Sequence, residues 1–265
     1  MKVRVLLAAF FCLFLVSEHA FSQFHPEVTL GVQYWYSTMN IGIKGLNWVK
    51  ADPVHRVGPY FGIGIWKVKF MATPFFGYMS LDYGRNIAFA DTAGKINYYA
   101  ENENFTLNDR LIDFNASLAY EIVPRMNLFF AVKNVSFETM KVFNVFDEYY
   151  FYSNAMYTIE RKERLYGGGV SGISKWPRLP FSFFWSGVYL QGTQRISEIY
   201  QVSHQEGVVG KGNYNVRLVE ITAGLGYEIG SGVVLMLGYR GDFRSGEAGS
   251  QNTHGFLVRT IFLVQ

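Results

Sequence analysis

The feature that most constrains the fold of this chain is a strict alternation of apolar residues with small or polar ones. From Ile112 to Ile122 every second side chain is apolar, and the residues between them are small, polar or charged. The same pattern recurs over residues 28–37 and 219–228. Successive side chains of a β-strand point to opposite faces, so a period of two predicts strands with one apolar and one polar face.

About ten segments of the chain share this strand pattern. They cover residues 27–39, 57–66, 70–80, 110–122, 127–138, 161–174, 181–195, 214–228, 233–242 and 253–264. The links between them alternate: 67–69, 123–126, 175–180 and 229–232 are short, whereas 40–56, 81–109, 139–160, 196–213 and 243–252 are long and polar. Short and long links therefore lie at opposite ends of the sheet.

This organisation is that of an all-β, antiparallel, up-and-down transmembrane β-barrel with short periplasmic turns and long extracellular loops. We expect about ten strands, within a range of roughly eight to twelve. Closure is expected because an open sheet edge would leave backbone N–H and C=O groups unpaired in the lipid.

The N-terminus has the pattern of a cleaved secretory signal peptide. Two basic residues precede an unbroken apolar run over residues 5–16, and Ala20 and Ser22 provide small residues for cleavage. As a helix the run would be too short for a bilayer core of about 30 Å. We therefore expect residues 1–22 to be the signal peptide and residues 23–265 to form the barrel domain.

Composition excludes several other classes of protein. Aromatic residues make up 18% of the chain, which argues against a disordered protein. A formal net charge of +3 without a long basic run argues against a nucleic-acid-binding protein. The one cysteine, Cys12, lies in the predicted signal peptide, so no disulfide is expected in the mature domain.

Several strand motifs resemble those of uncharacterised porin-like outer-membrane β-barrel proteins of Gram-negative bacteria. The motifs occupy residues 113–120, 127–133, 224–227 and 237–240. The resemblance implies a monomer in the cell outer membrane that contacts outer-membrane lipid and the barrel assembly machinery. The chain departs from the pattern at its end, because such barrels usually finish on an aromatic residue and this chain finishes on Gln265.

If the apolar faces contact lipid, the opposite faces carry charged residues into the lumen. The lumen-lining candidates are Asp113, Glu121, Lys133, Glu220, Glu228, Arg240 and Arg259. Charged residues at membrane depth need partners or water, and both signs are present, so we expect ion pairs. These pairs would either close a narrow lumen or line a path for small polar solutes, and Trp35 on the same polar face is expected to plug it.

The link over residues 139–160 contains a dense aromatic group. Its candidate contact residues are Tyr149, Tyr150, Phe151 and Tyr152. Exposed aromatic side chains form good contact surfaces for a partner. The alternative is that they pack over the mouth of the barrel.

Catalytic patterns are weak. His55 follows Asp52 and His204 follows Ser203, but neither pair has the context of a nucleophile and its base. No spacing indicates a metal site or a cofactor. We therefore predict a narrow porin-like channel or a structural surface protein without catalytic activity. An adhesin or receptor acting through residues 81–109 and 139–160 is the alternative, and an outer-membrane hydrolase is the third hypothesis.

Overall fold

The computed structural model describes residues 27–43, 48–90, 96–146, 152–202, 205–230 and 232–264. The predicted signal peptide, residues 1–22, lies outside these ranges. Within them no helix is long and apolar enough to cross a membrane.

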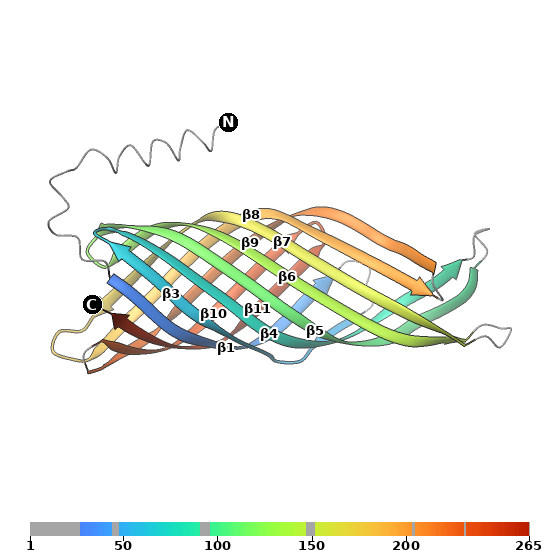
Figure 1. The fold of residues 1–265 in the computed structure, drawn as a ribbon, viewed down its shortest axis with the longest axis horizontal. Helices are drawn as coiled ribbons and strands as arrows, with labels where there is room; N and C mark the ends of the chain where they lie inside the picture. The colour runs from blue at the N-terminus through green and yellow to red at the C-terminus, as the bar shows by residue number, and fades with distance from the viewer. Residues whose placement is uncertain are drawn as a thin grey trace, which may run out of the picture.

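The described chain consists of β-strands joined mostly by hairpins (Figure 1). They are β1 (Glu27–Ile43), β2 (Trp48–Ala51), β3 (Val54–Ile65), β4 (Val68–Ala90), β5 (Ile96–Val123), β6 (Met126–Phe146), β7 (Tyr152–Lys175), β8 (Phe181–Val202), β9 (Gln205–Ile229), β10 (Val233–Gly246) and β11 (Gly249–Val264). The short β2 continues β3 along β4, since Ala51 pairs with Leu81 and His55 pairs with Tyr78. The wall of the barrel therefore has ten strands.

The wall closes on itself. Each wall strand pairs antiparallel with its neighbours in sequence, and β1 pairs with β11 from Val28 and Val264 to Ile43 and Gly249. The pairing of β4 with β5 completes the ring. Every wall strand has two neighbours, so the backbone hydrogen bonds are satisfied without water, as lipid requires. The predicted antiparallel barrel of about ten strands is confirmed.

The predicted long loops differ from what the structure shows. Strands β4 and β5 are paired from the Val68–Tyr120 pair to the Ala90–Ile96 pair. This pairing includes most of residues 81–109. The ladder between β6 and β7 reaches Phe146 and Tyr152. Contact with lipid requires the apolar alternation, so the alternation ends where the strands leave the membrane. Backbone pairing does not need lipid and continues further. The long links are thus mainly strand extensions.

The two faces of the wall differ as the alternation predicts. Large apolar side chains are exposed on the outer face, with Leu30, Phe114, Leu128 and Leu237 as examples. Exposed tyrosines and tryptophans border them, and an outer apolar band with aromatic borders is typical of a membrane barrel. The inner face carries buried polar residues and also apolar clusters, which the sequence pattern did not indicate.

Candidate functional site

A charged network crosses the interior of the barrel, and Lys133 on β6 is at its centre. Lys133 Nζ lies 3.1 Å from Asp113 Oδ2 on β5, 3.1 Å from Glu220 Oε2 on β9 and 3.4 Å from Asp242 Oδ2 on β10. The Lys133 side chain is 0% exposed. Because β7, β8 and β9 separate β6 from β10 in the wall, the contact with Asp242 spans the lumen.

Arg240 ties the carboxylates of β9 and β10 together. It donates from Nη2 to Glu220 Oε2 at 2.7 Å and from Nε to Asp242 Oδ1 at 3.0 Å. These are charge-assisted hydrogen bonds, which are stronger than bonds between neutral groups. Arg240 and Asp242 are neighbours on the inward face of β10, so the strand geometry itself pre-positions this pair.

Trp35 on β1 lies between two guanidinium groups. The Cζ atoms of Arg56 and Arg240 lie 4.3 Å and 4.4 Å from the centre of its ring. Trp35 is 0% exposed and also packs against Phe75 and Leu257. Cations over an aromatic face are attracted by its quadrupole, and more strongly where water is excluded. The indole therefore joins the charged network to the apolar interior.

A second group of charges surrounds Glu163 on β7. Arg161 donates to Glu163 Oε1 from Nε at 2.9 Å, and Gln194 Nε2 donates to the same oxygen at 2.8 Å. Arg244 Nε lies 3.2 Å from Glu163 Oε2, and Arg244 Nη2 lies 3.8 Å from Asp242 Oδ2. Arg244 thus links the two groups into one network.

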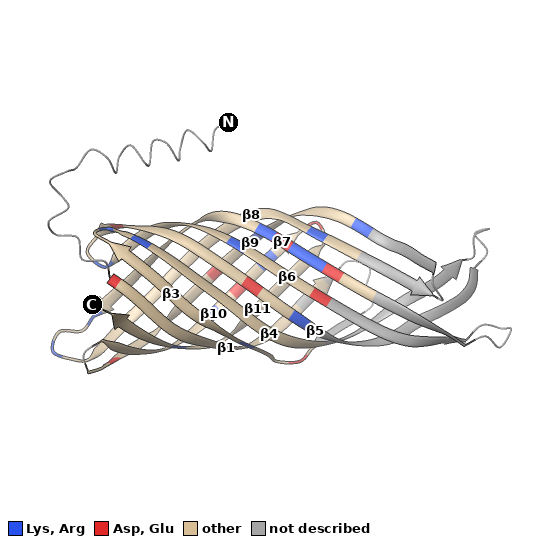
Figure 2. Ribbon diagram, in the orientation of Figure 1, with Lys and Arg blue, Asp and Glu red and all other residues tan. Residues whose placement is uncertain are grey.

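The charges of this network almost balance. Its described members are the cations Arg56, Lys133, Arg161, Arg240 and Arg244 and the carboxylates Asp113, Glu163, Glu220 and Asp242. Figure 2 shows residues of both signs gathered around the middle of the barrel. A buried charge is tolerated only when it is paired, so each member depends on the others. The network consists of ion pairs that cross the lumen, not of a ring of residues with the same charge.

The structure brings together four of the seven lumen-lining candidates and separates three. Asp113, Lys133, Glu220 and Arg240 share the central network. The three candidates outside this network are Glu121, Glu228 and Arg259. Four strands contribute the central four. The sequence predicted ion pairs among the inward charges but not which residues pair.

The three remaining candidates lie elsewhere. Arg259 stacks 4.6 Å over the Tyr60 ring and donates to Gln33 Oε1 at 3.1 Å. Glu121 and Glu228 are at the rim: Glu121 Oε1 accepts a bond from the Arg125 amide at 2.7 Å, and Glu228 forms an exposed pair with Lys175. Their polar-face register is that of the lumen, but each lies within two residues of a strand end, so water reaches it.

Sequence reasoning missed five members of the network. They are Arg56, Arg161, Glu163, Asp242 and Arg244. Arg56 and Arg244 were placed in the links 40–56 and 243–252, although β3 and β10 extend over them. The available signal was the period of two, which Arg240, Asp242 and Arg244 continue beyond the last apolar residue of the predicted strand.

In the sequence, the aromatic contact candidates come between the end of β6 and the start of β7. Tyr149, Tyr150 and Phe151 lie outside the described residues. Tyr152 is the first residue of β7, and its backbone pairs with Phe146. Their role in contacting a partner therefore stays a prediction.

The two described histidines lie on the outer wall rather than in the lumen. Tyr34 Oη is hydrogen-bonded to His55 Nδ1 at 2.6 Å, and the hydroxyl of Tyr239 is hydrogen-bonded to Nδ1 of His254. These outward pairs are separated from the inward carboxylates by the wall itself. Among the described residues, no group of three or more His, Cys, Asp or Glu side chains is arranged to hold a metal ion.

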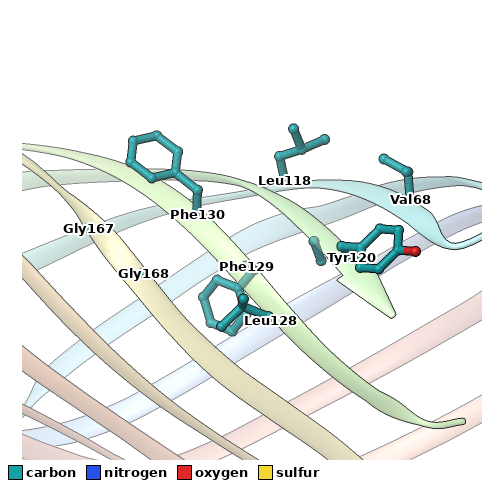
Figure 3. A pocket seen from close by; sticks show the side chains of 9 residues that line it. Val68, Leu118, Tyr120, Leu128, Phe129, Phe130, Gly167 and Gly168 are labelled. Carbon is teal, nitrogen blue, oxygen red and sulfur yellow. The ribbon is translucent and has the colours of Figure 1, made fainter. Parts of the chain in front are cut away.

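An apolar groove of about 440 Å³ lies near the end of the short turns (Figure 3). Its lining residues are Val68, Leu118, Ala119, Tyr120, Leu128, Phe129, Phe130, Gly167 and Gly168. Leu118, Tyr120, Leu128 and Phe130 belong to the exposed outer face. The groove offers no charged group to a polar solute and is separate from the charged network.

Comparison with known proteins finds only distantly similar solved structures. No protein-family model and no curated protein matches the sequence. Similar solved structures are outer-membrane β-barrel proteins. The chain has the fold of an outer-membrane β-barrel. This assignment depends on the closed ten-stranded wall and its exposed apolar outer face, not on the degree of similarity.

Three of these structures show how distant the similarity is. The outer membrane protease OmpT from Escherichia coli is 9% identical, with 91% of this chain and 98% of that chain covered and a TM-score of 0.47. The Pseudomonas putida toluene transporter TodX is 9% identical, with 90% and 89% covered and a TM-score of 0.40. Ail, the attachment invasion locus protein of Yersinia pestis, is 10% identical, with 90% and 99% covered and a TM-score of 0.32.

Proposed function

We propose that this protein is a non-conducting outer-membrane barrel, a structural surface protein whose role is carried by its extracellular part. Of the two functions that the sequence predicts, a narrow channel and a surface protein, the charged network favours the second. Its central residues are buried completely: Lys133 and Asp242 are each 0% exposed. A solute path through the middle of the lumen would leave such side chains accessible to water.

Apolar packing on the inner wall adds to this support. One cluster consists of Ala131, Leu165, Val188, Leu190, Val216 and Leu218, contributed by β6 to β9. Another consists of Phe184, Met236 and Ile261, with Tyr60 and Val234 packed against it. A small barrel is filled by its own side chains, whereas wide water-filled channels need about sixteen strands. Ten strands filled in this way support a closed lumen.

The extracellular strand extensions would let such a barrel support a surface that binds a partner. Backbone pairing holds β4 to β5 and β6 to β7 far beyond the residues with apolar alternation. Paired strands are stiffer than loops of the same length, so these extensions form a rigid support. We infer that any extracellular partner is bound there, with the Tyr149 to Tyr152 group as the candidate contact.

We also propose that the protein has no catalytic activity. A hydrolase needs a nucleophile or water-activating carboxylates beside a base. Of the four histidines outside the signal peptide, His55 and His254 bond to tyrosines on the outer wall. His25 and His204 lie outside the described residues. A purified sample that hydrolyses neither peptides nor phospholipids would agree with this proposal.

Ion conductance tests whether the lumen is closed. We expect wild-type protein in planar lipid bilayers to show no resolved single-channel steps. The charge-neutral double variant Lys133→Ala/Asp242→Ala removes two side chains from the middle of the lumen, so stepwise conductance should appear. The matched control Lys175→Ala/Glu228→Ala removes an exposed ion pair at the rim and should stay silent.

The proposal fails if the wild-type protein conducts in discrete steps that persist in the control. It would also fail if the wild type conducts and the Lys133→Ala/Asp242→Ala variant changes only ion selectivity. A heat-dependent shift in gel mobility, compared for all samples, shows that each variant is a folded barrel. Either of these two conductance results would restore the narrow-channel hypothesis.

A further inference from the structure

A patch of exposed cations lies on one side of the outer wall. It consists of Lys162 and Arg164 on β7, Arg195 on β8, and Lys211 and Arg217 on β9, and we name it the β7–β9 cationic patch. All five side chains are exposed. Figure 2 shows basic residues on β7 and β8 in this part of the wall. None of them takes part in the network inside the barrel.

The register of the strands places like charges against one another. Lys162 is directly opposite Arg195 in the β7–β8 ladder, and Arg164 follows on the same outer face of β7. Like charges directly opposite on a sheet are destabilising. Three acids border the patch: Glu138 on β6 is opposite Glu160, Glu160 pairs with Lys162, and Glu247 accepts a bond from Asn215. They leave the patch with an excess of positive charge.

The position of the patch indicates a ligand in the plane of the membrane. Tyr166 and Tyr189 lie next to it on the same outer face and are exposed, with the apolar residues Val132 and Val219 beside them. Tyrosines mark the boundary between the hydrocarbon and the headgroups. The patch therefore lies at the height of the headgroups of the outer leaflet.

The patch is one-sided. On the outer faces of β1, β10 and β11, the described residues beyond this boundary are Thr38, Asn40, Gly42, Gly241, Phe243, Ser245, Ser250, Asn252 and His254. They include no lysine or arginine. A general preference for anionic lipid would not require such asymmetry. A charged headgroup bound against three adjacent strands would require cations on those strands alone.

We propose that the β7–β9 cationic patch binds an anionic lipid of the outer leaflet whose headgroup carries two or more phosphates. Neighbouring strands lie about 4.8 Å apart, so the patch spans roughly 10 Å from β7 to β9. Phosphate oxygens accept charge-assisted hydrogen bonds from arginine and lysine, and they relieve the repulsion between Lys162 and Arg195.

Binding of a defined lipid tests this proposal. The probe is diphosphoryl lipid A, titrated into protein in an uncharged maltoside detergent and followed by native mass spectrometry. The patch variant is Lys162→Ser/Arg164→Asn/Arg195→Thr/Arg217→Gln. Each cation near an anionic lipid surface strengthens binding roughly fivefold, so the affinity should fall at least about a hundredfold.

The matched control removes four exposed cations at the short turns, Lys67→Ser/Arg125→Asn/Lys175→Ser/Arg178→Asn. Asparagine suits Arg125 and Arg178, whose φ angles are 70° and 67°. The control should bind lipid A as the wild type does. Thermal unfolding gives a second measurement: lipid A should raise the Tm of the wild type and the control but not that of the patch variant.

Equal lipid affinity of the patch variant and the control would overturn the proposal. So would wild-type protein that binds inorganic pyrophosphate or soluble dextran sulfate as tightly as lipid A, since the ligand would then be a soluble polyanion. Failure here leaves the closed lumen untouched, because the conductance experiment measures the interior only.

Discussion

Replacing Lys133 with methionine is expected to lower the free energy of unfolding by about 3–5 kcal/mol, because buried carboxylates lose their shared cation. Asp113 suffers most, since its other cation, Arg56, lies 4.0 Å away. Glu220 and Asp242 keep their bonds to Arg240. Urea-induced unfolding in lipid vesicles measures the change.

Two further variants separate loss of charge pairing from general damage. Lys175→Met removes an exposed cation that pairs with Glu228, and it should cost less than about 1 kcal/mol. Lys133→Met/Asp113→Asn removes the stranded charge as well, so it should recover part of the stability. A Lys133→Met protein as stable as Lys175→Met would contradict the ion-paired interior.

Trp35→Ala is expected to destabilise the barrel by about 3–5 kcal/mol. The substitution leaves a cavity between the guanidinium groups of Arg56 and Arg240 and removes the aromatic face that both contact. Trp35→Phe keeps an aromatic ring of smaller size and should lose less. The free energy of unfolding in vesicles measures both variants.

Trp66→Ala is the matched control for Trp35. Trp66 is 78% exposed in the turn between β3 and β4, so its removal creates no cavity. We expect its unfolding free energy to stay within about 1 kcal/mol of the wild type, since substitutions of exposed residues are usually mild. Similar losses for Trp35→Ala and Trp66→Ala would show that Trp35 does not brace the lumen.

The faces of the strands were predictable because lipid contact acts locally. A residue that faces hydrocarbon must be apolar whatever its neighbours are, so Phe114 and Leu118 reveal the register of β5 by themselves. That register also places Asp113 inside the barrel, and the alternation along β1 does the same for Trp35, as the structure shows. The ends of the strands were not predictable in the same way, since no lipid constrains residues 81–90 or 139–146.

The meeting of Lys133 with Asp242 could not be predicted from the sequence. Their strands are separated by three others, and the contact depends on the diameter and stagger of the closed barrel. The apolar alternation of the sequence determines neither the diameter nor the stagger. Lys162 and Arg195 are a similar case, because only the β7–β8 register shows that they are opposite each other.

The sequence by itself determined that this chain forms a membrane barrel of about ten strands and which side chains face inward, because burial in lipid selects residues one at a time. Only the tertiary structure decided that the inward charges pair with one another across a filled lumen and that the five cations of the β7–β9 cationic patch lie side by side. Both depend on which strands closure brings together, and pairing between distant strands is a property of the whole wall.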